Sequence, residues 1–177
     1  YARVRVGFLL NLVRYQPPSR RTIMKSRFYL FLSALMSCTL FAAVPDSAEE
    51  AEPLEKGANV PNPVVRSISG ESVSLESVLN GEPTVLVFYR GSWCPFCVRH
   101  LSELQEVKDD LADMGWKIVG VSPDKPENLK AALEKTEADY GLVSDSAMTA
   151  AKAFGVAFQV GNETLRKYKG YGINLTS

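Results

Sequence analysis

Two cysteines separated by two residues stand where a predicted strand gives way to a predicted helix. Cys94 and Cys97 follow the apolar run 84–89, and the residues after them keep a helical pattern as far as Met114. The first amides of a helix have no partners inside it, and the helix dipole places partial positive charge there, so a thiolate is stabilised. Pro95 suits the first turn because its missing N–H would have no partner there. The pattern predicts a reactive thiol.

The spacing of this pair favours redox chemistry over the other uses of such a motif. A two-residue spacer lets the two sulfurs form a disulfide without unfolding the helix, which makes a reversible two-electron switch. A zinc site needs four ligands, and beyond the pair the chain offers only Cys38 and His100. A c-type haem attachment needs His directly after the second cysteine, where Val98 stands. We therefore expect no metal and no cofactor; a purely structural disulfide is the remaining alternative.

The charges divide the chain into two unequal parts. Its 177 residues, 46% of them hydrophobic, suffice for one ordinary domain with extensions. Residues 1–45 hold seven basic residues and no acid, so residues 46–177 carry 13 basic against 20 acidic residues, a net charge of −7. An acidic domain without a basic stripe is a poor candidate for binding nucleic acid, so we expect no nucleic-acid partner.

The basic front part is interpreted as a targeting segment. Residues 24–27 are positively charged, and residues 28–44 form a 17-residue run without charge that ends in small residues. Residues 24–44 are therefore predicted to be a signal peptide, or a short anchor, since 17 residues is the lower limit for a span. Residues 1–23 precede the better start at Met24 and are interpreted as upstream translation. Cys38 lies in the apolar segment, where no redox role is expected.

This segment predicts that the protein is exported. It would then be either free in the periplasm or anchored in the membrane with its domain facing the periplasm. A membrane is expected as a partner only if the segment stays uncleaved. Residues 45–63 are rich in Glu and Pro and are interpreted as a linker. The domain proper is expected to cover residues 64–177.

Within the domain, predicted strands alternate with predicted helices. The expected elements are a hairpin from Val64 to Leu75 that turns at Gly70, a helical turn over 75–79, strands at 84–89, 116–121 and 141–143, helices at 95–114 and 126–137, and a helix through Met148, Ala151 and Phe154 capped by Asp145 or Ser146. The strand at 84–89 is expected to be central. This alternation predicts an α/β fold, a sheet with parallel neighbours and helices on both faces.

Four segments, in this order and spacing, resemble one family. They are the run from Val85 through Phe88-Tyr89-Arg90-Gly91-Ser92-Trp93 to Cys94-Pro95-Phe96-Cys97, then Gly120-Val121-Ser122-Pro123-Asp124, then Leu142-Val143-Ser144-Asp145, and then Ala151-Lys152-Ala153-Phe154-Gly155-Val156. They are similar to the AhpC/TSA peroxiredoxin-like branch of the thioredoxin fold, over residues 57–177. The resemblance implies a thioredoxin-like fold and a thiol peroxidase with an antioxidant role, which reduces hydrogen or organic peroxides. It also implies recharging by a thiol electron donor such as a thioredoxin-like protein.

The chain departs from this family in its cysteine motif. Most members carry Pro-x-x-x-Thr-x-x-Cys. Counted back from Cys97, the Pro and Thr positions hold Arg90 and Cys94; counted back from Cys94, they hold Val87 and Gly91. Because the motif is absent in both registers, it does not show which thiol attacks the peroxide.

The second departure concerns the end of the fold. Thioredoxin-like proteins carry a cis-proline packed against the active cysteine, and a closing hairpin and helix follow it. In this chain no proline follows Pro126. We therefore expect this domain to be incomplete at its C-terminal side, with the closing hairpin and helix missing.

Three residues are the candidate catalytic groups. Cys94 is the expected nucleophile, since the first cysteine of such a pair usually lies at the exposed end of the helix, and Cys97 would resolve the oxidised form. Arg90 either supports the thiolate or is a solvated charge at the strand end. The intact Cys-x-x-Cys and the export signal also suit an exported thiol-disulfide oxidoreductase that acts on protein cysteines. A non-enzymatic module that binds a partner is a third possibility.

Overall fold

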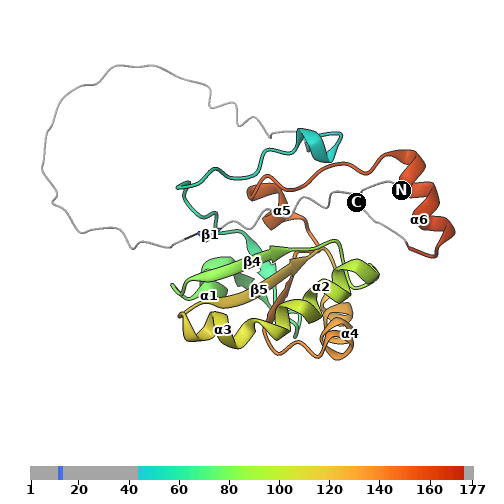
Figure 1. The fold of residues 1–177 in the computed structure, drawn as a ribbon. Coiled ribbons are helices and arrows are strands. Elements are labelled where there is room, and N and C mark those ends of the chain that lie inside the picture. Colours follow the sequence, from blue (N-terminus) through green and yellow to red (C-terminus); the bar gives the residue numbers. More distant parts are fainter. Residues whose placement is uncertain (1–11, 14–43, 174–177) are drawn as a thin grey trace, which may run out of the picture.

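A mixed sheet carries the domain, and the computed structural model describes it over residues 12–13 and 44–173 (Figure 1). The strands are β1 (Leu12–Val13), β2 (Val64–Arg66), β3 (Ser72–Ser74), β4 (Thr84–Phe88), β5 (Lys117–Ser122) and β6 (Gly141–Ser144). Their order in the sheet is β1-β4-β5-β6-β2-β3. The neighbours β4, β5 and β6 are parallel, whereas β1 and the hairpin β2–β3 join antiparallel at opposite ends. The predicted signal segment and Cys38 lie outside the described residues.

Helices cover both faces of this sheet, as the alternating pattern predicts. The helices are the 3₁₀ turn η1 (Ala48–Glu50), α1 (Leu75–Leu79), α2 (Pro95–Glu106), α3 (Lys108–Asp113), α4 (Pro126–Thr136), α5 (Thr149–Ala153) and α6 (Asn162–Gly170). On one face, Leu101 of α2 and Leu129 of α4 pack on Val85 and Ile118. On the other, Ala150 of α5 packs with Val119. Burial on both faces explains why β5 is a continuous apolar run, not an alternating one.

The hairpin, the short helix and the three parallel strands lie where the sequence predicts them, but two helices do not. The helix expected over 95–114 is broken at Val107, and Val107 and Met114 are exposed instead of packed in the core. Gln105 and Lys108, on either side of the break, both bind Asp139. The helix is therefore interrupted at the point where both of its flanking residues bind the loop after α4.

The helix expected through Met148, with its cap at Asp145 or Ser146, begins only at Thr149, because Met148 has a left-handed backbone with φ +56°. Asp145 still satisfies its first amides, accepting from the N–H groups of Ala150 at 2.9 Å and Ala151 at 2.7 Å. The predicted strand at 84–89 is interior but not central. It is second from one edge, next to the two-residue β1, and β5 and β6 form the middle of the sheet.

Gly115 ends the α3 region. Its backbone is left-handed, with φ +76°, and its N–H donates to the carbonyl of Ala112 at 2.9 Å. The N–H of Trp116 reaches back to the carbonyl of Leu111 at 2.9 Å. These two bonds form the glycine-terminated helix end that returns the chain to the sheet.

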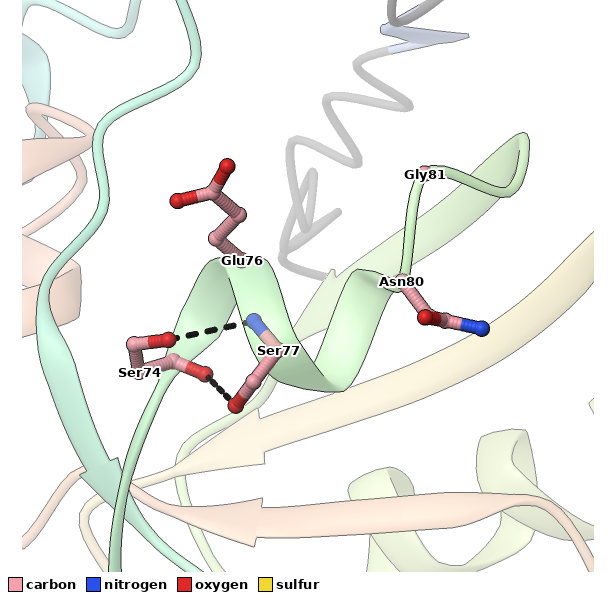
Figure 2. A pocket seen from close by; sticks show the side chains of 5 residues that line it. All are labelled: Ser74, Glu76, Ser77, Asn80 and Gly81. Carbon is pink, nitrogen blue, oxygen red and sulfur yellow. Dashed lines mark hydrogen bonds between the residues drawn. The ribbon is translucent and has the colours of Figure 1, made fainter.

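Helix α1 is held at its start by a serine cap and borders a small pocket (Figure 2). The hydroxyl of Ser74 accepts from the N–H of Ser77 at 3.1 Å, and the Ser77 hydroxyl donates to the Ser74 carbonyl at 2.7 Å. The pocket, about 390 Å³, is lined by Ser74, Glu76, Ser77, Asn80 and Gly81. Neither Cys94 nor Cys97 lines it.

The segment before the sheet runs along the chain between α5 and α6 (Figure 1). The N–H of Leu54 donates to the carbonyl of Phe154 at 3.2 Å, and the N–H of Gln159 donates to the carbonyl of Pro45 at 2.7 Å. Residues 45–63, interpreted from sequence as a linker, are thus hydrogen-bonded to the domain, and Asn62 and Pro63 at their end also accept from the first amides of α1. Over residues 12–13 and 44–173, the chain forms no helix of the length and apolarity that crossing a membrane requires.

Candidate active site

The turn from β4 to α2 positions the cysteines, and its shape depends on Gly91. Gly91 has φ +143°, a conformation that side-chain-bearing residues avoid. A Cβ there would lie 2.6 Å from Nε1 of Trp93 and 3.0 Å from Oδ1 of Asp124. The next residue is fixed as well, since the N–H of Ser92 donates to Oδ2 of Asp124 at 2.6 Å. The turn is therefore anchored to the loop that follows β5.

Cys94 occupies the N-cap of α2, the position that the sequence predicts for a reactive thiol. Its Sγ accepts from the N–H of Cys97 at 3.3 Å, as a capping side chain does. The Sγ of Cys97 donates to the same sulfur at 2.8 Å, and both cysteines are free thiols. The prediction that these two sulfurs lie within reach of one another is confirmed.

Arg90 completes the surroundings of the Cys94 sulfur. Its Nη2 donates to Sγ of Cys94 at 3.0 Å, and its Nη1 donates to the hydroxyl of Tyr168 at 3.0 Å. The guanidinium also lies over the Trp93 ring, 5.6 Å from its centroid, an arrangement in which a cation is attracted to the face of the ring. Arg90 is thus directed at the thiol and is not only a solvated charge.

These contacts separate the acidities of the two thiols. Burial alone would raise the pKa of Cys94, but hydrogen bonds from the Cys97 thiol and amide and the charge of Arg90 outweigh it, so the pKa is lowered. The pKa of Cys97 is raised, first by burial and then by its hydrogen bond to Cys94. Of the two thiols, Cys94 is therefore the more acidic and the first to lose its proton as pH rises.

One expectation about the pair is wrong. Cys94 was predicted at the exposed end of the helix, but its side chain is only 1% exposed, whereas Cys97 is half-buried. The reason is the N-cap geometry, which turns the sulfur back over the first amides of α2. Phe96, between the cysteines, is 74% exposed. Arg90, Trp93 and Cys97 line a broad open hollow of about 2050 Å³.

Sequence reasoning missed two residues of this site. Asp124 lies in a segment that the resemblance includes, but no role is predicted for it; it is buried, and its Oδ2 accepts from the Ser92 amide and from the Ser122 hydroxyl at 3.2 Å. Tyr168 lies on α6, where no helix is predicted, and its ring packs on Trp93 at 5.3 Å between centroids. No local pattern in the sequence connects Tyr168 with residues 78 positions earlier.

A second tyrosine, the partly buried Tyr89, directly precedes Arg90. The hydroxyl of Tyr89 is buried and has no hydrogen-bond partner among the described residues. Burial raises the pKa of Tyr89 to about 12. Tyr89 therefore stays protonated and neutral at physiological pH.

Comparison with known protein families places this domain in one of them. The model of the AhpC/TSA family matches residues 56–169. This chain belongs to that family. The resemblance read from the sequence is therefore confirmed, and so is the thioredoxin-like fold.

Individual relatives agree with this assignment. The chain is 32% identical to a putative peroxiredoxin bcp of Haemophilus influenzae over 104 residues, which are 59% of this chain and 66% of the relative. It is 31% identical to peroxiredoxin Bcp of Escherichia coli K12, with the same coverage. The chain thus matches slightly less than two thirds of the length of these relatives.

Solved structures show the same fold. Peroxidoxin BcpB from Mycobacterium tuberculosis has a TM-score of 0.52 and 27% identity, over 56% of this chain and 64% of that one. Reduced Prx3 from Vibrio vulnificus, solved in complex with hydrogen peroxide, has a TM-score of 0.54 and 23% identity, over 58% of this chain and 68% of that one. The second likeness is evidence for the fold alone.

Proposed function

We propose that this protein is a thiol peroxidase that reduces hydrogen or organic peroxides through Cys94, with an antioxidant role. The observation that carries the proposal is the convergence of three donors on one sulfur: Nη2 of Arg90, the N–H of Cys97 and the Cys97 thiol. A sulfur so placed is held as a thiolate, the form that attacks. Membership of the AhpC/TSA family supports the same activity.

The proposed reaction has three steps that balance. The Cys94 thiolate attacks one peroxide oxygen, the O–O bond breaks, and Cys94 becomes a sulfenic acid while the leaving oxygen takes a proton and departs as water or an alcohol. The Cys97 thiol then attacks that sulfur, which forms the disulfide and releases water. A thiol donor, such as a thioredoxin-like protein, returns two electrons and two protons.

Arg90 has two tasks in this scheme. It stabilises the attacking thiolate in the resting enzyme, and it lies where negative charge develops on the leaving oxygen. Free thiolates react slowly with peroxide, so positioning and charge stabilisation must supply the acceleration. The family threonine that would orient the peroxide is absent, and Arg90 together with the first amides of α2 takes its place.

Stopped-flow kinetics of the full-length protein tests this proposal. Cys94 oxidation by hydrogen peroxide and by an organic hydroperoxide should exceed the rate of a simple thiol by several orders of magnitude. Comparison of the two peroxides identifies the preferred substrate. A rate no better than that of a free thiol rejects the peroxidase.

A second candidate is thiol-disulfide exchange with protein substrates. What favours it is the pair itself, since Cys97 lies 2.8 Å from Cys94 and can resolve a mixed disulfide as readily as a sulfenic acid. Reduction of insulin disulfides, measured beside peroxide consumption, separates the two activities. Rapid insulin reduction with a peroxide rate like that of a free thiol selects this candidate.

We also propose that the protein is exported to the periplasm, either free or anchored. The basis is the charged start at 24–27 followed by the uncharged run 28–44. Cell fractionation of the intact protein and of a variant without residues 24–44 tests this. Export predicts that only the intact protein reaches the periplasmic or membrane fraction; the same distribution for both rejects it.

A further inference from the structure

Helix α6 touches the reactive centre through a single side chain. Its residues are largely exposed and none is buried, and Tyr168, half-buried, is the member that meets the turn at 90–93. The remaining polar side chains include the exposed pair Glu163–Lys167, 2.8 Å apart, which lies within α6. The contact of Tyr168 with the centre therefore calls for a reason other than core packing.

We propose that Tyr168 is a positioning residue: its hydroxyl holds the Arg90 guanidinium against the Cys94 sulfur. The two ends of the guanidinium are divided between two acceptors. Nη1 donates to the Tyr168 hydroxyl at 3.0 Å, and Nη2 donates to Sγ of Cys94 at 3.0 Å. A long flexible side chain loses conformational freedom when it is fixed, and a second acceptor helps to fix the planar fork in one orientation.

The ring of Tyr168 contributes separately. It packs on Trp93 at a centroid distance of 5.3 Å and an interplanar angle of 59°, and Trp93 also lies beneath the guanidinium. Arg90, an exposed residue, thus has a ring on one side and a hydroxyl at its end. The hydroxyl and the ring can be removed one at a time, which makes their roles separable.

The titratable groups around this contact come from several elements. Cys97 on α2 donates to Cys94, Tyr168 on α6 accepts from Arg90, and Asp124 after β5 holds the Ser92 amide of the same turn. Of these, only the Tyr168 hydroxyl is connected to the thiolate through Arg90. A change at Tyr168 should therefore act like a weakened Arg90.

The inference deepens the proposed function, but its test does not need peroxide turnover. Iodoacetamide alkylation of the reduced full-length protein is followed from pH 5 to pH 10, and tandem mass spectrometry assigns the label to Cys94 or Cys97. Because alkylation reports the thiolate, Tyr168→Phe, which keeps the ring, should move the Cys94 midpoint to higher pH. Below the midpoint, labelling of Cys94 should slow roughly two- to fivefold, as expected for a weakened charge-assisted hydrogen bond.

Three further variants make the test specific. Tyr171→Phe, at an exposed position just after α6, should leave the profile unchanged. Tyr168→Leu, without ring and hydroxyl, should shift it at least as far as Tyr168→Phe. Adding Tyr168→Phe to Arg90→Ala should produce no further shift, because its effect passes through Arg90.

Two results would overturn the inference. One is an unchanged Cys94 alkylation profile for Tyr168→Phe, whatever Tyr168→Leu does. If Tyr168→Leu alone shifted that profile, the effect would belong to the ring and not to the hydroxyl. The other is an equal shift from Tyr168→Phe in the Arg90→Ala background. Failure of the proposed function is a different result, namely slow peroxide consumption by a protein whose alkylation profile still responds to Tyr168→Phe.

Discussion

The turn at 90–97 and helix α6 meet at one side chain, yet they are built in opposite ways. The turn joins a buried strand to the start of α2, and Asp124 and the Gly91 conformation fix it. Helix α6 is polar, contributes no buried residue and adds one aromatic contact. The comparison teaches that the local geometry of the turn brings Arg90 and both cysteines together, whereas a distant surface helix provides the second acceptor of the Arg90 guanidinium.

The largest expected effect lies in the turn, at the sulfur itself. Cys94→Ser should abolish peroxide consumption, because serine offers no polarisable thiolate. Cys97→Ser should leave the first oxidation of Cys94 intact but slow recycling or permit over-oxidation, because the resolving thiol is gone. Mass spectrometry after peroxide treatment follows both. Native-rate sulfenic acid on Cys97 in Cys94→Ser would reverse the assignment of the two thiols.

The next largest effect is expected at Arg90, the residue of the turn that binds Tyr168 of α6. Arg90→Ala should lower the rate of peroxide reduction by about 10- to 100-fold, less than the roughly 100- to 1000-fold typical of losing one donor in a buried oxyanion hole, because Arg90 is exposed. It should also move the midpoint of the pH–rate profile upward. Since Arg90 lowers the pKa of Cys94, the thiolate of the native protein persists as pH falls further, and the variant loses it at higher pH.

The matched control for Arg90→Ala is Arg99→Ala. Arg99 lies on the exposed side of α2, 78% exposed and paired with Glu103 at 3.1 Å. It should leave rate and midpoint unchanged. If Arg90→Ala and Arg99→Ala lower the rate equally, the positive charge of the protein in general assists the reaction, and the contact of Arg90 with Cys94 does not. Arg90 in the turn would then have no role that the surface residue Arg99 lacks.

A smaller effect concerns stability and compares one glycine from each region. Gly91→Ala should lower the free energy of unfolding by about 1–3 kcal/mol, because φ +143° is strained for alanine and its Cβ would crowd Trp93. Gly170→Ala, at the end of α6, meets nothing within 4 Å and should be neutral or slightly stabilising. Urea denaturation measures both. Equal losses would show that the turn is no more constrained than α6.

Much of the turn could be predicted from sequence, because its determinants are local. The apolar run of β4, the proline of the first helical turn and the spacing of the cysteines each have a direct structural meaning, and the three candidate residues Arg90, Cys94 and Cys97 do come together. The burial of Cys94 was not predictable in this way. It depends on how the N-cap sulfur turns over the helix amides, and residue spacing does not specify that.

Helix α6 shows the other limit. Its sequence has few apolar residues, so periodicity gives no reason to place a helix there, and the contact of Tyr168 is set by tertiary structure. The break at Val107 also involves a distant residue. Asp139, more than 30 residues further along the chain, accepts from Gln105 and Lys108 on either side of the break. Local patterns therefore predict the reactive sulfur but not the partners that long-range packing brings to it.

The smallest expected effect examines α6 without touching Tyr168. Glu163→Gln removes the i,i+4 partner of Lys167, a pair whose side chains are 75% and 64% exposed. Exposed pairs of this kind contribute only about 0.2–0.5 kcal/mol, so the free energy of unfolding should change by no more than that. Peroxide consumption and the Cys94 alkylation profile should stay as they are, because the pair lies within α6 and neither residue bonds to Arg90. A shift in that profile as large as that of Tyr168→Phe would show that the site responds to the stability of the whole helix. The effect would then belong to α6 as a whole and not to the Tyr168 hydroxyl.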